Sequence, residues 1–117
     1  ILVFGTLLEV VLEVAAKINA TVVDMRFVKP LDMDMVNTLS ETHSVFVTVE
    51  DGVVSGGAGS AVCEALSSGS ERVLNLGLPD RFVSHGDTEN LLSDCGLDAK
   101  GILEQINDYT KALQPER

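Results

Sequence analysis

Apolar and polar positions alternate along the chain with two different periods, one typical of strands and one typical of helices. Short runs rich in apolar and β-branched residues predict strands at residues 1–4, 21–27, 44–49 and 72–76. Apolar residues also recur every three or four positions, which predicts helices near residues 7–18, 32–39, 62–69, 91–92 and 102–109. Strands that alternate with helices indicate an α/β fold with a mostly parallel sheet and helices on both faces.

Length and composition fit one domain with a single type of core. The chain has 117 residues, of which 45% are apolar and only 4% are aromatic, so we expect a core of Val, Leu, Ile and Ala. Cys63 and Cys95 match no metal-ligand spacing, which favours free thiols in a reducing compartment. The chain opens inside a predicted strand at Ile1, without an initiator Met or a signal-peptide pattern. We therefore expect residues 1–117 to form a single domain of a longer chain.

The charge balance argues against two classes of partner. Eighteen acidic residues against 8 basic ones give a net charge of −10. Nucleic-acid backbones and anionic membrane surfaces repel such a protein. No apolar run approaches the roughly 20 residues that a membrane-spanning helix needs.

A glycine-rich segment, Gly56-Gly57-Ala58-Gly59-Ser60, follows the third predicted strand and opens a helix. Free amides at a helix N-terminus attract anions, so this segment could bind a phosphate. Its spacing matches neither the dinucleotide fingerprint nor the lysine-bearing phosphate loop, and the preceding Glu50-Asp51 would repel a phosphate. We favour a packing role, in which the glycines let the helix approach a neighbouring strand or a partner subunit closely.

The acidic pair Glu50-Asp51 ends the third predicted strand, at the edge where α/β sheets usually bind ligands. Two carboxylates could bind a cation or serve an acid–base step. They could equally accept backbone hydrogen bonds and cap the loop. Because no third acidic residue or His lies close in sequence, we favour a structural or interface role over a metal site.

Two further residues are candidates for catalysis. His85 follows the fourth predicted strand, and an imidazole can act as an acid or base near neutral pH, but no nucleophile elbow lies nearby. Cys63 lies in the helix after the glycines, where a thiol can be activated, but its apolar neighbours favour a small core residue. A small hydrolase or transferase that uses Cys63 or His85 is thus the weakest hypothesis.

Four segments form a recognisable pattern when they are taken in chain order. They are Phe4-Gly5-Thr6-Leu7, the run from Asp24 to Asp32, Thr48-Val49-Glu50-Asp51 with Gly56–Ser60, and the run from Leu76 to Phe82 with His85-Gly86. Together they resemble the C-terminal domain of the transketolase family, and in particular its 1-deoxy-D-xylulose-5-phosphate synthase branch. The run from Asp24 to Asp32 is the part most specific to that branch.

The resemblance implies a fold and an activity for the parent enzyme. The fold is a three-layer α/β/α sandwich with a mixed sheet of about five strands, one of them antiparallel, for which Phe82-Val83 is a candidate. The parent is a homodimeric transferase of the bacterial cytoplasm or plastid stroma. It uses thiamine diphosphate and Mg²⁺ to condense pyruvate with glyceraldehyde 3-phosphate, and its product feeds isoprenoid, thiamine and pyridoxal synthesis. The family's cofactor motifs lie outside these residues, so the resemblance implies no catalytic, cofactor or metal residue here.

We therefore expect a structural and assembly domain that is not catalytic alone. Its partners would be the other domains of the parent and a second subunit. The candidate interface or anion-contact residues are Glu50, Asp51, Gly56, Gly57, Gly59, Ser60, Asp80, Arg81 and His85. The alternative is an independent anion-binding regulatory module that uses the helix N-terminus at Gly56–Ser60.

Overall fold

The structure is a computed structural model that describes residues 1–26, 30–53, 57–79 and 88–114. Strands and helices alternate through most of these ranges, as the hydrophobic pattern predicts. The elements in chain order are β1 (Leu2–Phe4), α1 (Leu8–Ile18), β2 (Val23–Asp24), α2 (Met33–Ser40), β3 (Val45–Val53), α3 (Ala58–Ala65), β4 (Arg72–Leu78), α4 (Thr88–Asp94) and α5 (Ala99–Ala112).

The strands form one sheet in the order β2-β1-β3-β4, and each neighbouring pair is parallel. Leu2 of β1 lies opposite Val23 of β2 on one side and Thr48 of β3 on the other. The α/β class with a parallel sheet is confirmed. The described residues form four strands, one fewer than the family resemblance implies, and Phe82-Val83 lies outside them.

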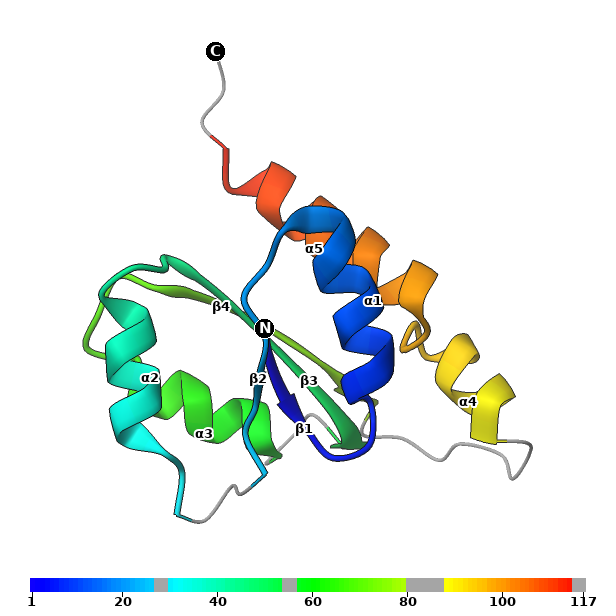
Figure 1. Ribbon diagram of the computed structural model, residues 1–117, viewed down its shortest axis with the longest axis horizontal. Helices are drawn as coiled ribbons and strands as arrows, with labels where there is room; N and C mark the ends of the chain where they lie inside the picture. The colour runs from blue at the N-terminus through cyan, green and yellow to red at the C-terminus, as the bar shows by residue number, and fades with distance from the viewer. Residues whose placement is uncertain (27–29, 54–56, 80–87, 115–117) are drawn as a thin grey trace.

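Helices cover both faces of the sheet, α1 and α5 on one face and α2 and α3 on the other (Figure 1). Successive side chains of a strand point to opposite faces. Phe46 of β3 therefore packs with α2 and α3, whereas the next residue, Val47, packs with α1 and α5. The result is the three-layer arrangement that the resemblance implies.

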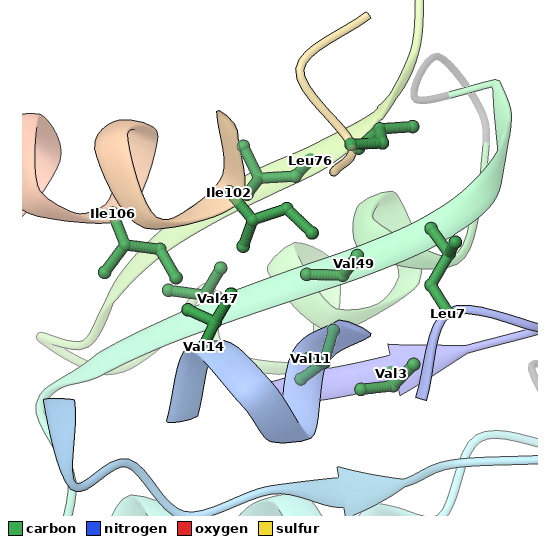
Figure 2. Close-up of a cluster of buried hydrophobic side chains, with 10 residues drawn as sticks. Val3, Leu7, Val11, Val14, Val47, Val49, Leu76, Ile102 and Ile106 are labelled. Atoms are coloured by element: carbon green, nitrogen blue, oxygen red, sulfur yellow. The ribbon is translucent and has the colours of Figure 1, made fainter. Parts of the chain in front are cut away.

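The core on the α1 and α5 side consists of branched aliphatic side chains. Figure 2 shows Val11 of α1 and Ile102 and Ile106 of α5 gathered over Val47 and Val49 of β3. None of these five side chains is more than 5% exposed. Burying a side chain of this size contributes about 1.5–3 kcal/mol, so this cluster accounts for a large part of the stability of the domain.

Two boundaries at the carboxyl edge of the sheet differ from the prediction. Strand β3 continues to Val53, so Glu50-Asp51 lie within the strand and not at its end. Val49 pairs with Leu76 and Val53 pairs with Leu78, so β3 advances by four residues between these pairs while β4 advances by two. The register of the two strands shifts between these pairs, and the pairing continues beyond the shift. Because Val53 pairs with Leu78, β4 also runs past its predicted end at residue 76.

Helix α5 begins at a side-chain cap, Asp98. One carboxylate oxygen of Asp98 accepts a hydrogen bond from the Gly101 N–H at 2.8 Å, and the other accepts one from the Ser93 hydroxyl at 3.0 Å. These bonds, the one from Gly101 foremost, lower the pKa of Asp98 below the ordinary value of 3.8. The carboxylate thus joins the end of α4 to the start of α5.

Candidate functional site

Strands β1 and β3 are neighbours, but the chain leaves their carboxyl ends toward opposite faces of the sheet. Helix α1 follows β1 and covers one face, and α3 follows β3 and covers the other (Figure 1). Parallel α/β sheets usually bind ligands outside the strands at such a switch point. Here the switch point consists of Gly5 and Thr6, directly after β1, and of Glu50 and Asp51 in β3.

The Glu50 carboxylate is buried at the N-terminus of α3. Its side chain is 5% exposed, and its two oxygens accept hydrogen bonds from the Ala58 N–H at 2.9 Å and the Gly59 N–H at 3.2 Å. The residue at the N-cap position, Gly57, supplies no side-chain cap. A helix N-terminus carries unpaired N–H groups and a partial positive charge. The Glu50 carboxylate, which comes from β3, therefore provides the negative charge that the N-terminus of α3 attracts.

The Asp51 carboxylate fastens the turn after β1 to strand β3. One of its oxygens accepts hydrogen bonds from both the N–H of Thr6, at 3.1 Å, and the Thr6 hydroxyl, at 2.7 Å. The turn depends on Gly5, whose φ of +97° is unfavourable for other residues. A Cβ atom at Gly5 would also overlap the Asp51 carboxylate. The acidic pair thus caps two backbone segments that come from different parts of the chain.

Gly59 allows α3 to approach the sheet closely. A Cβ atom at this position would lie 2.5 Å from Oδ1 of Asn75 and 2.7 Å from Oγ1 of Thr48. Those two side chains are joined by a hydrogen bond from the Thr48 hydroxyl to Asn75 Oδ1 at 2.7 Å. Asn75 in turn donates to the sulfur of Cys63 at 3.3 Å. The close packing that the glycines predicted is confirmed at Gly59.

The described polar groups of the switch point bind one another, and these bonds fix the positions of α3 and of the turn after β1. The α3 amides of Ala58 and Gly59 are paired with Glu50, and the Thr6 donors are paired with Asp51. A phosphate at this position would have to displace a carboxylate from these donors and would be repelled by both negative charges. Within the described ranges, no group of three or more His, Cys, Asp or Glu side chains is placed to hold a metal ion.

The residues singled out from the sequence fall into two sets. Glu50, Asp51, Gly57, Gly59 and Ser60 are described, and the first four border the switch point or the first turn of α3. The remaining candidates lie outside the described residues: Gly56, Asp80, Arg81 and His85. The hydrogen bonds considered for the acidic pair are present, whereas its interface role stays a prediction. Helix α3 begins at Ala58, earlier than the predicted helix near residues 62–69.

Three residues that matter to this arrangement were not named as candidate site residues from the sequence. Thr6 binds Asp51 from 45 positions away, and Thr48 binds Asn75 from 27 positions away. Thr48 and Asn75 lie in predicted strands, where the pattern indicated only β structure. The one available signal was Asn75, a polar amide between Leu74 and Leu76 in an otherwise apolar strand.

A comparison with protein families gives a match over most of the chain. The family model described as "Transketolase, C-terminal domain" matches residues 1–102. One solved structure, described as "Split gene transketolase, inactive beta4 tetramer", is similar over 92% of this chain and 37% of its own, with a TM-score of 0.82 and 30% identity. The TM-score and the coverage show that the two chains share a fold over most of this chain.

Two similar curated relatives have the same description. The 1-deoxy-D-xylulose-5-phosphate synthase of Paraburkholderia xenovorans (strain LB400) is 58% identical over 110 residues, which cover 92% of this chain and 17% of the relative. The synthase of the same description from Haemophilus influenzae (strain ATCC 51907 / DSM 11121 / KW20 / Rd) is 53% identical over 111 residues, covering 93% and 18%. The chain therefore spans less than a fifth of the length of the curated relatives it matches.

Proposed function

Because this chain belongs to the transketolase C-terminal domain family, we propose that it is the C-terminal structural and assembly domain of a 1-deoxy-D-xylulose-5-phosphate synthase. The parent would condense pyruvate with glyceraldehyde 3-phosphate. Support for this branch of the family comes from relatives of that description, which are 51–58% identical over 92–93% of this chain. In this proposal, residues 1–117 form one domain of the longer synthase and have no activity alone.

The observation that carries the proposal is the internal pairing of the switch point. In a ligand-binding α/β domain, donors at this position are available to the ligand. Here Glu50 and Asp51 engage the amides of Ala58, Gly59 and Thr6. These bonds hold α3 and the β1 turn in fixed positions relative to the sheet, which suits a domain that presents a surface to other domains.

Thiamine diphosphate and Mg²⁺ are the cofactors implied for the parent. The switch point does not fit a diphosphate, because Glu50 already neutralises the α3 N-terminus and Asp51 adds a second negative charge beside it. Diphosphate binding requires several free donors or cations, as helix N-termini and Mg²⁺ provide elsewhere. We therefore assign the cofactor to other domains of the parent. The alternative of an anion-binding regulatory module would need the same α3 amides that Glu50 engages.

We place the contacts with the rest of the parent at the carboxyl edge of the sheet. The segments Glu50–Ser60 and Asp80–Gly86 would face a neighbouring domain or the second subunit of a homodimer. None of the helices in the described part of the chain has the length and apolarity that a membrane span requires. The bacterial sources of the relatives favour the bacterial cytoplasm over the plastid stroma.

The test is to remove residues 1–117 from the parent and measure its assembly and cofactor binding separately. Light scattering would report the mass of the assembled enzyme, and calorimetry would report the affinity for thiamine diphosphate with Mg²⁺. We expect the assembled mass to fall while binding of the cofactor persists in the fraction that remains folded. An intact dimer after the deletion would contradict the proposal.

A further inference from the structure

Two residues other than glycine have a left-handed backbone conformation, Asn19 with a φ of +53° and Arg26 with a φ of +52°. Residues with a Cβ atom are strained in this conformation, and Asn tolerates it better than most. Asn19 has an evident reason for it, because it is the C-cap of α1 and its N–H donates to the Ala15 carbonyl. Arg26 caps none of the described helices, so its strain needs another explanation.

Arg26 follows the last anchored residue of the β2 segment. The N–H of Met25 donates to the Val3 carbonyl at 2.9 Å, which continues the pairing of β2 with β1. The Met25 side chain is buried and packs with Leu2 and Phe4 in the core on the α2 and α3 side. Arg26 comes next and is exposed. It therefore lies directly after a fixed point, at the same carboxyl edge of the sheet as the switch point.

The Arg26 guanidinium has no partner within the part of the domain that the structure describes. It makes neither a hydrogen bond nor an ion pair with another described residue, although the chain carries 18 acidic residues against 8 basic ones. Glycine at this position would relieve the strain, because it adopts the left-handed conformation freely. Strained residues persist where something beyond the local backbone requires them, and they cluster at functional contacts. The side chain of Arg26 is therefore the feature that requires a partner.

We propose that the Arg26 guanidinium binds a carboxylate of the longer parent that lies outside residues 1–117, and that this ion pair is one of the contacts by which the domain docks. The inference rests on the proposed assembly role and names the chemistry of one contact in it. The chain spans less than a fifth of the length of the curated relatives it matches, so a docked domain would meet surfaces from outside these residues. The planar guanidinium donates in a fork that matches the two oxygens of a carboxylate, and the two charges are complementary.

A carboxylate fits this position better than the phosphate of a small ligand. A bound phosphate usually takes several donors or cations. The N–H and the hydroxyl of Thr6, at the same edge, are already bound to Asp51. The negative charges of Glu50 and Asp51 would also repel a phosphate, which carries more charge than a carboxylate. A single guanidinium is sufficient for one carboxylate, which it binds through two parallel hydrogen bonds.

The first measurement identifies the partner by chemical cross-linking of the full-length parent. A carbodiimide joins a lysine amine to a carboxylate that is in contact with it. The Arg26→Lys variant therefore converts the proposed ion pair into an amide that mass spectrometry can map. We expect the introduced lysine to be joined to an Asp or Glu outside residues 1–117.

Asn19→Lys is the matched control for the cross-link. Asn19 is exposed and has the same left-handed conformation, but it lies at the end of α1 and not at the carboxyl edge of the sheet. The Arg26→Lys cross-link should form at least about tenfold faster than any cross-link from Asn19→Lys to residues outside 1–117, since only a contact holds the amine and the carboxylate together.

The second measurement needs no substitution. Phenylglyoxal modifies accessible guanidinium groups, and its rate at Arg26 in the assembled parent is compared with its rate at the same residue after unfolding in urea. We expect the modification of Arg26 to be at least about tenfold slower in the assembled parent, because the bound carboxylate covers the guanidinium until the contact opens.

Modification of Arg26 at the rate of the unfolded protein would overturn the inference, as would an Arg26→Lys cross-link confined to carboxylates within residues 1–117. Slow modification without any cross-link would also overturn it, because the group that covers Arg26 would then not be a carboxylate. Both readouts are separate from activity. A parent that shows the outside cross-link but does not condense pyruvate with glyceraldehyde 3-phosphate would refute the proposed reaction and leave the contact standing. An active parent with a freely modified Arg26 would refute the contact alone.

Discussion

Replacing Glu50 by Gln tests whether this carboxylate is the internal anion of α3. The carboxylate accepts from two buried amides, at 2.9 and 3.2 Å, and is 5% exposed. An amide side chain has one acceptor oxygen, so either the Ala58 or the Gly59 N–H would face an NH₂ group. A buried N–H without an acceptor costs about 1–3 kcal/mol, and the lost charge at the helix N-terminus costs roughly another 0.3–1 kcal/mol. Gln avoids the desolvation of a charge, which offsets part of this cost.

The net expectation is a loss of about 2 kcal/mol in the free energy of unfolding, since the unpaired amide is the largest of these contributions. Urea unfolding of the 117-residue chain, followed by circular dichroism at neutral pH, would measure it. Glu13→Gln on the exposed side of α1 makes the same chemical change without a buried partner and serves as the matched control. If the two variants differ by less than about 0.5 kcal/mol, the assignment of Glu50 as the cap of α3 is wrong.

Two further predictions concern packing and capping. Gly59→Ala should lower the free energy of unfolding by about 1–3 kcal/mol, because the new Cβ atom would overlap Asn75. Gly52→Ala is the control and should be nearly neutral, because its Cβ atom would lie 3.8 Å from the nearest atom. Equal losses for the two variants in urea unfolding would refute the packing role of Gly59. Asp98→Ala should cost about 1 kcal/mol at neutral pH, because the Gly101 N–H loses its acceptor. The folded-state pKa of Asp98 is lowered, so its contribution is present above pH 3.8 and is lost as the pH falls below that value. The free energies of unfolding of the Asp98→Ala variant and of the unsubstituted 117-residue chain should therefore converge in acid. A difference that is constant with pH would contradict the assignment of Asp98 as the cap of α5.

Local sequence patterns were sufficient to predict which segments form strands and which form helices. They also predicted part of the candidate site. Strand β3 follows from its β-branched run, and α1 follows from the helical spacing of Val11, Val14 and Ile18. The capping option for Glu50-Asp51 and the packing option for the glycines were also visible, because each follows from the chemistry of a residue type and its position beside a strand end.

The remaining features depend on contacts between distant residues. The continuation of β3 to Val53, past a register shift, depends on its pairing with β4 and has no local sequence signal. The partner of Asp51, Thr6, is 45 positions away and is set by the strand order. His43 is half-buried, and its ring contacts the Thr21 hydroxyl at 3.2 Å and the Leu39 carbonyl at 3.1 Å, the first of which lies 22 positions away in the chain.

The assembly role is tested most directly by adding the purified 117-residue chain back to a parent that lacks residues 1–117. Sedimentation would follow the mass of the complex, and thiamine diphosphate binding would be measured in parallel. We expect the added chain to restore the assembled mass without being required for cofactor binding, and the Glu50→Gln chain to restore less of that mass than the Glu13→Gln chain at equal concentration. A truncated parent that assembles fully without the added chain would contradict the assembly role.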